Sequence, residues 1–301
     1  MDRRCARAFR ANLTPMKAEL LALAAIALWG SLATLGVVLA QVPPFLLTGL
    51  GLLLGSLIAL PLSRFRLRAW RVPPRTLAIG VGGLFGFHFL LFMALRYAPP
   101  VEANLVNYLW PLGIVVLAPL YLPAVPFRWA YVPAAALGFA GAALAILGAG
   151  TGQPFAGGFQ VGYAFALGSA FIWASYSLLT KRLPYFPTAA VGSFAALAGA
   201  LSLLCHAVFE PPTTLSAKDW LLIVLLGLGP LGGAFFLWDA ALKIGDPRRI
   251  GLLAFLTPLL STGLLMLSRH QSLSPSLAVA CLMIVGAAFW GRRIAVARPP
   301  D

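Results

Sequence analysis

The feature that constrains this chain most is an internal repeat. Residues 77–111 align without a gap on residues 224–258, and 12 of the 35 aligned positions are identical. Each copy predicts an apolar helix, a short turn that contains a proline, and a second apolar helix that a proline interrupts. Sequence repeats of this kind reflect repeated supersecondary units. We therefore expect a chain of two related halves, each with one helix broken at the same place.

The lengths of the apolar runs determine the class of protein. Runs of about 20 apolar residues, the length that a helix needs to cross a bilayer, recur along the whole chain. Charged residues make up 10% of the sequence, against about 25% in soluble domains. The sequence lacks the alternation of apolar and polar residues that marks a membrane β-barrel. The chain is therefore predicted to be an all-α integral membrane protein.

Ten transmembrane helices are expected, separated by prolines, glycines or charges. The predicted spans cover residues 18–39, 44–62, 76–95, 101–122, 129–149, 159–180, 188–208, 219–242, 248–267 and 276–293. The first apolar run, which reaches Ala40, is too long for the core of a cleaved signal peptide, so we interpret it as the first span. No connection between spans is long enough to hold a soluble domain.

Basic residues lie almost wholly between the apolar runs and set the expected orientation. With the N-terminus in the cytoplasm, 19 of the 22 lysines and arginines fall on the cytoplasmic side, and only Arg96, Lys218 and Arg269 fall outside. This bias predicts that both termini are cytoplasmic and that the number of spans is even. It also explains the net charge of +14 without a nucleic-acid partner. The three cysteines are isolated from one another and predict neither a disulfide framework nor a metal site, and we expect no cofactor.

Five spans in each half make the two halves inverted, because the second half then enters the membrane from the opposite side. Leu28-Trp29-Gly30-Ser31 in the first span also aligns with Ile172-Trp173-Ala174-Ser175 in the sixth. Inverted repeats place a substrate site near the middle of the membrane and let one fold open to either side, which favours a carrier over a receptor or an enzyme. We expect a cytoplasmic tail over residues 1–17, a first repeat over 18–150, a second repeat over 159–295 and a cytoplasmic tail over 296–301.

Polar side chains within the spans should face an interior pathway, because lipid solvates them poorly. The first copy of the repeat supplies five candidates, which are His88, Asn104, Asn107, Tyr108 and Trp110. Two interpretations of His88 stay open: it is an interior histidine bonded to Tyr108, or it contacts substrate or carries a proton, since histidine titrates near neutral pH. Trp29 and Trp173 lie deep in their spans at equivalent positions, which favours lining of the pathway over anchoring at the interface. Tyr176 is expected to add a hydroxyl group to the same cavity.

Two interrupting prolines predict helix breaks near this pathway. Pro111 has no N–H, so the carbonyl of Asn107 loses its usual helical partner, and Pro258 has the same effect in the second copy. Each freed carbonyl can accept a hydrogen bond from an ammonium or a hydroxyl; the alternative is that each proline only kinks its helix. Six glycines at equivalent positions of the two copies are expected to allow close, sliding helix contacts: Gly80, Gly82 and Gly86, and Gly227, Gly229 and Gly233.

Carboxylates are few, and none is expected in the middle of the membrane. Glu102 is expected near Arg96, with which it can pair, and Asp239 is expected to pair locally with Lys243 one helical turn away. This pattern argues against a carboxylate proton relay and against permanent organic cations as substrates. A cavity of aromatic rings, hydroxyls, amides and one histidine suits neutral or zwitterionic solutes with an apolar body.

These features together resemble a known family. Ten spans in two inverted repeats, Leu28-Trp29-Gly30-Ser31, and Tyr108-Leu109-Trp110-Pro111 with its counterpart Phe255-Leu256-Thr257-Pro258 are similar to the drug/metabolite transporter superfamily with two EamA-type repeats. The resemblance covers about residues 17–295. Within the superfamily, His88 together with Asn107-Tyr108-Leu109-Trp110-Pro111 resembles the YddG-type aromatic amino acid exporters of bacterial inner membranes.

The resemblance implies export of amino acids, aromatic and other mainly neutral ones, from cytoplasm to periplasm by alternating access. It also implies a central cavity formed by spans 1, 3, 4, 6, 8 and 9, and we expect a monomer in the lipid bilayer. The small four-span relatives use a carboxylate within span one for proton coupling, whereas this chain has Trp29 and Gly30 there and Glu19 only at the edge. That departure favours a facilitated or weakly coupled carrier.

Two alternatives remain open at this point. One is a carrier of the same superfamily that exports drugs, nucleosides or other small metabolites. The other is an intramembrane enzyme that pairs Ser31 or Ser169 with His88, although no nucleophile motif supports it.

Overall fold

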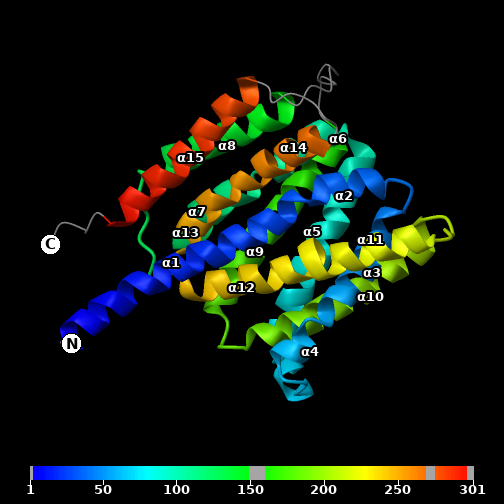
Figure 1. Ribbon diagram of the computed structural model, residues 1–301, viewed down its shortest axis with the longest axis horizontal. Helices are drawn as coiled ribbons and strands as arrows, with labels where there is room; N and C mark the ends of the chain where they lie inside the picture. The colour runs from blue at the N-terminus through cyan, green and yellow to red at the C-terminus, as the bar shows by residue number, and fades with distance from the viewer. Residues whose placement is uncertain (1–2, 149–159, 269–274, 297–301) are drawn as a thin grey trace.

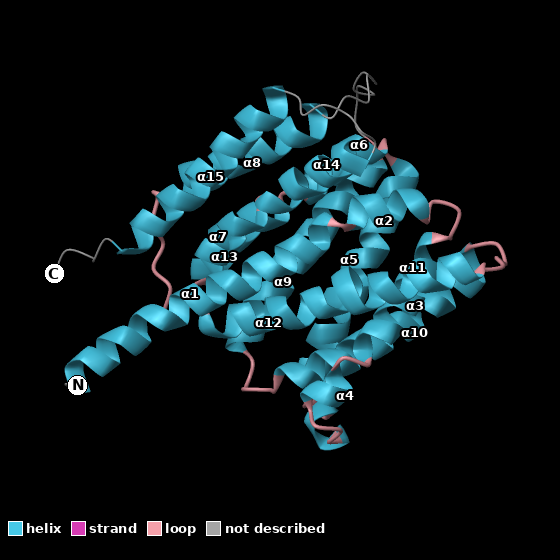
Figure 2. Ribbon diagram, viewed as in Figure 1, coloured by secondary structure: helices cyan, strands magenta, loops and turns pink. Residues whose placement is uncertain are grey.

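The chain folds into a bundle of helices. The computed structural model describes residues 3–148, 160–268 and 275–296, and these residues contain helices and loops but no strand (Figure 2). Within them, nine segments are long and apolar enough to cross a membrane, and residues 131–147 form a shorter apolar helix. All ten segments begin and end within two residues of the predicted spans. The predicted break at residues 150–158 lies outside the described residues.

The helices follow one another along the chain with short connections (Figure 1). They are α1 (Arg3–Gly30), α2 (Leu32–Val38), α3 (Pro44–Ser56), α4 (Ala59–Leu62), the 3-10 turn η1 (Leu67–Trp70), α5 (Pro74–Tyr97), α6 (Pro100–Asn107), α7 (Trp110–Tyr121), α8 (Tyr131–Gly148), α9 (Val161–Arg182), the 3-10 turn η2 (Thr188–Ala190), α10 (Val191–Phe209), α11 (Ala217–Leu228), the π-helical turn η3 (Gly229–Gly233), α12 (Ala234–Ile244), α13 (Pro247–Ala254), α14 (Leu256–Ser268) and α15 (Pro275–Val296).

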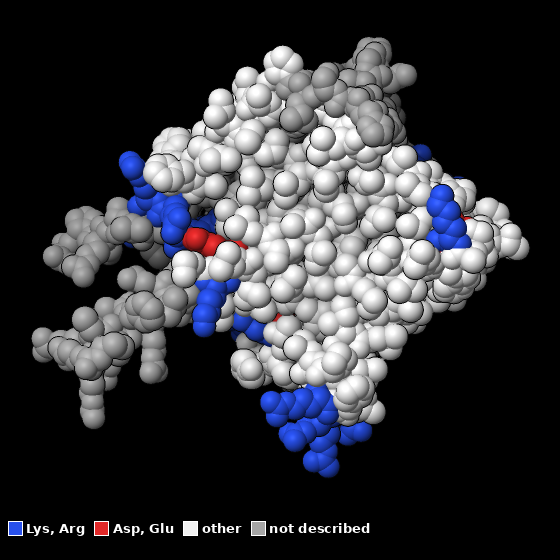
Figure 3. Space-filling view, in the orientation of Figure 1, with Lys and Arg blue, Asp and Glu red and all other residues white. Residues whose placement is uncertain are grey.

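Charge distinguishes the two ends of the bundle. The start of α1, the α4–η1 segment, the α12–α13 turn and the end of α15 lie at one end, and lysines and arginines gather there (Figures 1 and 3). We call this end the basic face. The turns that follow α2, α5 and α10 lie at the other end, which we call the opposite face. Between the two ends the visible surface is almost free of charge, as a membrane-embedded belt requires.

The predicted helix breaks occur at equivalent places in the two halves. Span four divides into α6 and α7, and span nine divides into α13 and α14. Pro111 lies in the first turn of α7, where its missing N–H removes no hydrogen bond from the helix. Pro258 lies in the first turn of α14 in the same way. The breaks themselves are confirmed, and any movement at them stays a prediction.

The first helix of each half packs against helices of the other half. α1 packs against α12, α13 and α14 of the second half, whereas its counterpart α9 packs against α5, α6 and α7 of the first half. The remaining spans form further pairs, α3 with α10 and α8 with α15. This exchange of equivalent helices joins the halves into one bundle and places the ends of the broken spans beside α1 and α9.

Small residues make two of the close contacts in this exchange. A Cβ added at Gly162, at the start of α9, would lie 2.6 Å from the Cβ of Ala98 in the α5–α6 turn. A Cβ added at Gly245, in the α12–α13 turn, would lie 2.7 Å from the Cβ of Ala18 in α1. In the repeat, Gly162 is equivalent to Ala18 and Gly245 is equivalent to Ala98. Each contact therefore holds one methyl group, and the first copy supplies it in both cases.

The close contacts in the first copy involve Gly80, as expected, but not Gly82. A Cβ added at Gly82 would meet no atom within 4 Å, whereas Cβ atoms at Gly80 and Gly83 would overlap aromatic side chains of α10 and α9. The close packing expected at Gly82 is therefore wrong, because the rotation of α5 turns this residue away from its neighbours. Gly229 has only an ordinary contact at 3.8 Å, and it begins the π-helical turn instead.

Candidate central cavity

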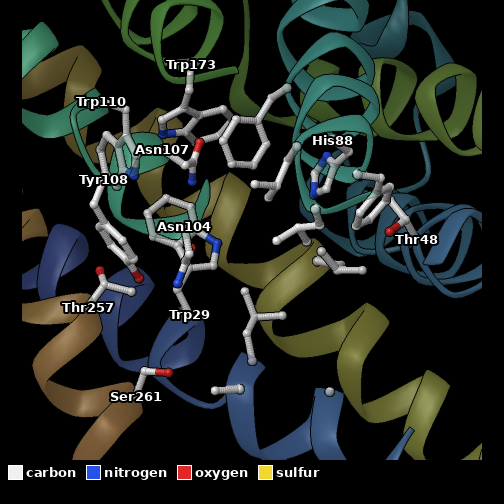
Figure 4. A pocket seen from close by; sticks show the side chains of 18 of the residues that line it. Trp29, Thr48, His88, Asn104, Asn107, Tyr108, Trp110, Trp173, Thr257 and Ser261 are labelled. Atoms are coloured by element: carbon white, nitrogen blue, oxygen red, sulfur yellow. The ribbon is translucent and has the colours of Figure 1, made fainter. Parts of the chain in front are cut away.

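A cavity of about 410 Å³ lies between the two halves, within the range of about 300–1,000 Å³ usual for small-molecule sites. Figure 4 shows Asn107, Tyr108 and Trp110 on one side of it, and His88 and Thr48 on another. The expected spans 1, 3, 4, 6, 8 and 9 all contribute to its wall, and span two adds residues of α3. Its aromatic and polar lining consists of Trp29, Thr48, Phe87, His88, Phe92, Asn104, Asn107, Tyr108, Trp110, Trp173, Phe235, Thr257 and Ser261.

Aromatic rings close the cavity towards the basic face. The centroid of the Trp29 ring lies 5.1–6.2 Å from four other ring centroids, in tilted and edge-to-face arrangements that aromatic pairs favour. The Trp29 indole N–H donates to the carbonyl of Pro230 in η3 at 3.1 Å. We call this cluster the aromatic floor; its members are Trp29, Trp110, Trp173, Phe235 and Trp238.

His88 contributes one free ring nitrogen to the cavity. Its Nδ1 lies 2.7 Å from the carbonyl oxygen of Leu84, one turn earlier in α5. Because a carbonyl only accepts hydrogen bonds, Nδ1 carries the proton, and the neutral ring leaves Nε2 as an acceptor. The bond to Tyr108 considered from the sequence is absent among the described residues. The ring bonds instead to the carbonyl of Leu84, which lies one turn earlier in the same helix and is therefore held close to His88 by the helix itself.

Two fully buried polar atoms in the wall have no hydrogen-bond partner among the described residues. They are Oδ1 of Asn107, at the end of α6, and Oγ1 of Thr257, at the start of α14. A buried polar group left unbonded costs about 1–3 kcal/mol, so native proteins rarely keep one without a reason. Both residues adjoin the helix breaks of spans four and nine. Their placement in one cavity indicates a site for a polar ligand.

Six of the seven residues expected to contact substrate line the cavity: Trp29, His88, Asn107, Tyr108, Trp110 and Trp173. The seventh, Tyr176, is buried on the far side of Trp173, with their ring centroids 5.3 Å apart, and packs against α5 at Gly83. Tyr176 therefore supports the floor from behind, and the expectation that its hydroxyl faces the cavity is not met.

Several lining residues were not singled out by sequence reasoning. The repeat could have indicated Phe235, which is equivalent to His88, and Thr257, which is equivalent to Trp110. No sequence signal pointed to Thr48 or Ser261, because isolated hydroxyl residues are common in membrane helices.

Below the aromatic floor, ion pairs and close packing seal the bundle at the basic face. Asp239 is 1% exposed and pairs with Lys243 at 2.6 Å, which confirms the predicted pair one helical turn apart. Lys243 also donates to Thr188 at 3.2 Å and lies over the ring of Phe186. Nearer the surface, Glu19 of α1 pairs with Arg249 of α13 at 2.5 Å.

The predicted pair of Glu102 with Arg96 is wrong. Glu102 instead accepts a hydrogen bond from the hydroxyl of Tyr163, which joins α6 to α9 near the opposite face. In the repeat, Tyr163 is equivalent to Glu19 and Glu102 to Arg249. Equivalent positions therefore link the halves at both ends of the bundle. We call Glu19–Arg249 the basic clasp and Tyr163–Glu102 the opposite clasp.

The two serines considered as nucleophiles are bonded elsewhere. The hydroxyl of Ser31 donates to the Leu28 carbonyl at 2.7 Å, and that of Ser169 donates to the Phe87 carbonyl at 2.9 Å. The described residues therefore contain no hydrogen bond between either serine and His88, and the geometry of a serine–histidine catalytic pair is not formed.

Known proteins share this sequence and architecture. Residues 16–147 and 160–291 match the EamA-like transporter family. The aromatic amino acid exporter YddG of Ancylobacter novellus is 41% identical over 274 residues, covering 90% of this chain and 95% of that protein. The aromatic amino acid exporter YddG of Escherichia coli is 25% identical over 286 residues, covering 91% and 96%. A solved crystal structure, 41% identical, superposes with a TM-score of 0.86 over 92% of this chain and 96% of that one. With two matched repeats and relatives aligned over nearly its whole length, this multi-pass membrane protein belongs to the EamA-like transporter family.

Proposed function

We propose that this protein exports amino acids, aromatic and other mainly neutral ones, from the cytoplasm to the periplasm as a monomeric carrier of the bacterial inner membrane. The basic face and both termini lie in the cytoplasm, in accordance with the positive-inside rule. One observation carries the proposal: a cavity with aromatic walls contains unpartnered polar atoms on Asn107 and Thr257. The substrate named for the exporters of Ancylobacter novellus and Escherichia coli supports the same chemical class.

The cavity offers complementary groups to both ends of an amino acid. The apolar side chain packs on the aromatic floor, where ring faces provide most of the wall. Oδ1 of Asn107 and Nε2 of His88 accept hydrogen bonds from the ammonium group. The hydroxyls of Tyr108 and Thr257 donate to the carboxylate. No carboxylate lines the cavity within the described part of the chain, which disfavours permanent cations as substrates.

Transport follows alternating access between two inverted repeats, residues 18–150 and 159–295. The cavity lies on the periplasmic side of the aromatic floor, so the described conformation is the one from which substrate leaves. Loading from the cytoplasm requires the floor and the basic clasp to open. The breaks before Pro111 and Pro258 are the equivalent places where spans four and nine bend during this exchange.

Efflux from proteoliposomes tests the proposal. The purified protein is reconstituted with labelled phenylalanine, tryptophan, methionine and threonine inside, and efflux is followed with and without an imposed pH gradient. We expect saturable efflux, and a decrease of about tenfold or more for His88→Ala and for Trp110→Ala, because each removes a wall of the site. Trp220→Ala is the matched control, since this tryptophan is 45% exposed on the outside of α11.

The same experiment distinguishes the alternatives. Unchanged efflux kinetics in both cavity variants would show that the site is elsewhere. Efflux of drugs or nucleosides with no efflux of any amino acid would refute the proposed substrate class and leave a carrier of the same family. A response to the pH gradient would indicate proton coupling, with His88 examined first, and no response would indicate a facilitated carrier.

A further inference from the structure

A second cavity, also of about 410 Å³, lies at the opposite face. The α2–α3 turn, the end of α5 and the end of α10 form its walls. Phe92 and Leu95 line both this cavity and the central one. We call the second cavity the vestibule. Because the two cavities share these residues, they lie next to each other, with the vestibule nearer the opposite face.

The vestibule has an aromatic wall and a stiff rim. Phe45 is 3% exposed, and its ring centroid lies 5.2 Å from that of Phe92 and 6.4 Å from that of Phe209. The rim contains three prolines, at positions 43, 44 and 211, whose fixed φ angles restrict the backbone. A preformed cavity of this kind binds a ligand with little loss of its own conformational freedom.

The charged groups of the vestibule leave one cation available. Glu210 accepts hydrogen bonds from the backbone N–H groups of Phe45 at 2.8 Å and Leu46 at 3.1 Å, and it lies 2.9 Å from Nδ1 of His206. Its carboxylate is therefore committed to the N-terminus of α3 and to α10. Arg96 lines the same cavity, is exposed, and forms no ion pair with any residue that the structure describes.

Comparison of the two copies shows which ion-pair partner is missing beside Arg96. Its equivalent, Lys243, pairs with Asp239, four residues earlier in α12. The residue equivalent to Asp239 is Phe92, four residues before Arg96 in α5. In the first copy, an aromatic ring that lines the vestibule thus stands where the second copy has a carboxylate. A carboxylate brought by a ligand can take the equivalent place beside Arg96.

We propose that the vestibule is a second binding site, which takes a zwitterionic amino acid after it leaves the central cavity. The guanidinium of Arg96 binds the carboxylate, and the side chain of the ligand packs on Phe45 and Phe92. Gln41 serves the other end: its Nε2 donates to Asp219 at 2.7 Å, so Oε1 stays available to accept from the ammonium. This inference rests on the proposed export of amino acids and adds an exit site to it.

Equilibrium binding of labelled tryptophan to the full chain in nanodiscs of zwitterionic lipid tests the site. We expect two molecules per chain for the wild type and one for Arg96→Gln, with the affinity of the second site weakened about tenfold or more, because a charge-assisted hydrogen bond is lost. Arg96→Lys keeps the charge and retains part of the second binding. Lys218→Gln is the matched control, since it removes an exposed cation of the same face outside the vestibule and should keep two sites.

Two further arms test the chemistry of the ligand and the repeat argument. Tryptamine, which lacks the carboxylate, should bind once to the wild type. Phe92→Asp should rebuild in the first copy the pair that Asp239 and Lys243 form in the second. The new carboxylate then occupies Arg96 and excludes tryptophan from the vestibule, although Arg96 itself is unchanged.

The outcomes separate this site from the proposed function. One site in the wild type, or two sites in Arg96→Gln, would overturn the vestibule site and leave amino acid export in place. An equal loss of tryptophan binding at the second site in Arg96→Gln and Lys218→Gln would also overturn it, because a general effect of surface charge would then explain the result. No binding of tryptophan or any other amino acid to the wild type would overturn the proposed function, and the vestibule site with it.

Discussion

The two copies of the repeat follow the same path but present different chemistry. In the first copy, His88, Asn104 and Asn107 line the central cavity. Their equivalents are Phe235, which belongs to the aromatic floor, and Gly251 and Ala254. Gly251 and Ala254 are buried in contact with neighbouring helices, and a Cβ added at Gly251 would lie 3.1 Å from a backbone oxygen of α7. At these three positions the first copy is polar and lines the cavity, whereas the second copy is apolar and closely packed.

If transport follows the proposed alternating access, this difference favours one of the two inverted conformations over the other. Two identical inverted copies would make the described conformation and its inverse equal in free energy, so neither would be preferred. Here the second copy has the Asp239–Lys243 ion pair and small residues that favour close packing, while the first copy supplies most of the polar side chains that line the cavity. Two kinds of substitution should therefore make the two copies more alike. One weakens the close packing of the second copy, and the other removes polar groups from the first.

The largest expected effect comes from the aromatic floor, where the two copies meet. Trp29→Ala removes the ring that contacts all other members of the floor and the N–H that holds η3. We expect a loss of about 3–5 kcal/mol of unfolding free energy, as for other buried large-to-small changes. Thermal unfolding of the purified protein measures it, with Trp220→Ala as the exposed control. A Trp29→Ala variant as stable as the control would show that the floor does not hold the second copy closed.

The second-largest effect on stability should come from Lys243, whereas its equivalent Arg96 should contribute little. Lys243→Met leaves the buried carboxylate of Asp239 without its partner and should cost about 3 kcal/mol of unfolding free energy. Arg96→Met removes an exposed cation without an ion pair among the described residues, so its effect in the absence of amino acids should stay within about 0.5 kcal/mol. Parallel denaturation of the two variants compares them directly. Equal losses would mean that the two copies have not diverged at this position.

The two clasps should give smaller effects. Glu19 and Arg249 are 18% and 17% exposed, between a surface pair and a buried pair, so Glu19→Gln should cost about 1–2 kcal/mol of unfolding free energy. Tyr163→Phe, in the opposite clasp, should cost about 1 kcal/mol. The double variant Glu19→Arg with Arg249→Glu should recover most of the loss from the basic clasp. If the exchanged pair were no more stable than Glu19→Gln, the attraction between the two charges would not be what stabilises this end.

The smallest effect on stability is expected where the first copy is polar. Asn107→Leu removes an unpartnered buried oxygen, so stability should change by less than about 1 kcal/mol, while amino acid efflux should fall about tenfold through loss of a hydrogen bond to the ligand. Thr34→Val is the matched control, because its hydroxyl oxygen is also buried and unpartnered but does not line the cavity. Efflux that falls equally in both variants would show that the effect does not come from the cavity.

Much of the fold could be predicted from the sequence, because a bilayer sets the length of each helix and prolines mark its ends. The same physics located the site in part. Tryptophans deep in a span and polar residues inside lipid have few other places to point, and Trp29, Trp173 and Asn107 do line the cavity. Local pairs one helical turn apart, such as Asp239 with Lys243, could also be predicted because the helix alone brings them together.

What could not be predicted depends on how the helices rotate and which neighbours they meet. The spacing of residues along α5 does not reveal that Gly82 faces away from the other helices. Glu102 finds Tyr163 on a helix of the other half, more than 60 positions away in sequence, and so bypasses the nearby Arg96. His88 bonds within its own helix, although a tyrosine from a neighbouring helix lines the same cavity.

The contacts of Ala18 with Gly245 and of Gly162 with Ala98 each join an alanine of the first half to a glycine of the second half. At these contacts, each half packs well only against the other half. Suppose that two copies of the first half assembled as a symmetric dimer. Two alanines would then meet at each contact, where Cβ atoms at 2.6–2.7 Å would overlap. Two copies of the second half would bring two glycines and leave each contact without its methyl group. At these two contacts, therefore, neither half keeps a surface that could pair with a second copy of itself.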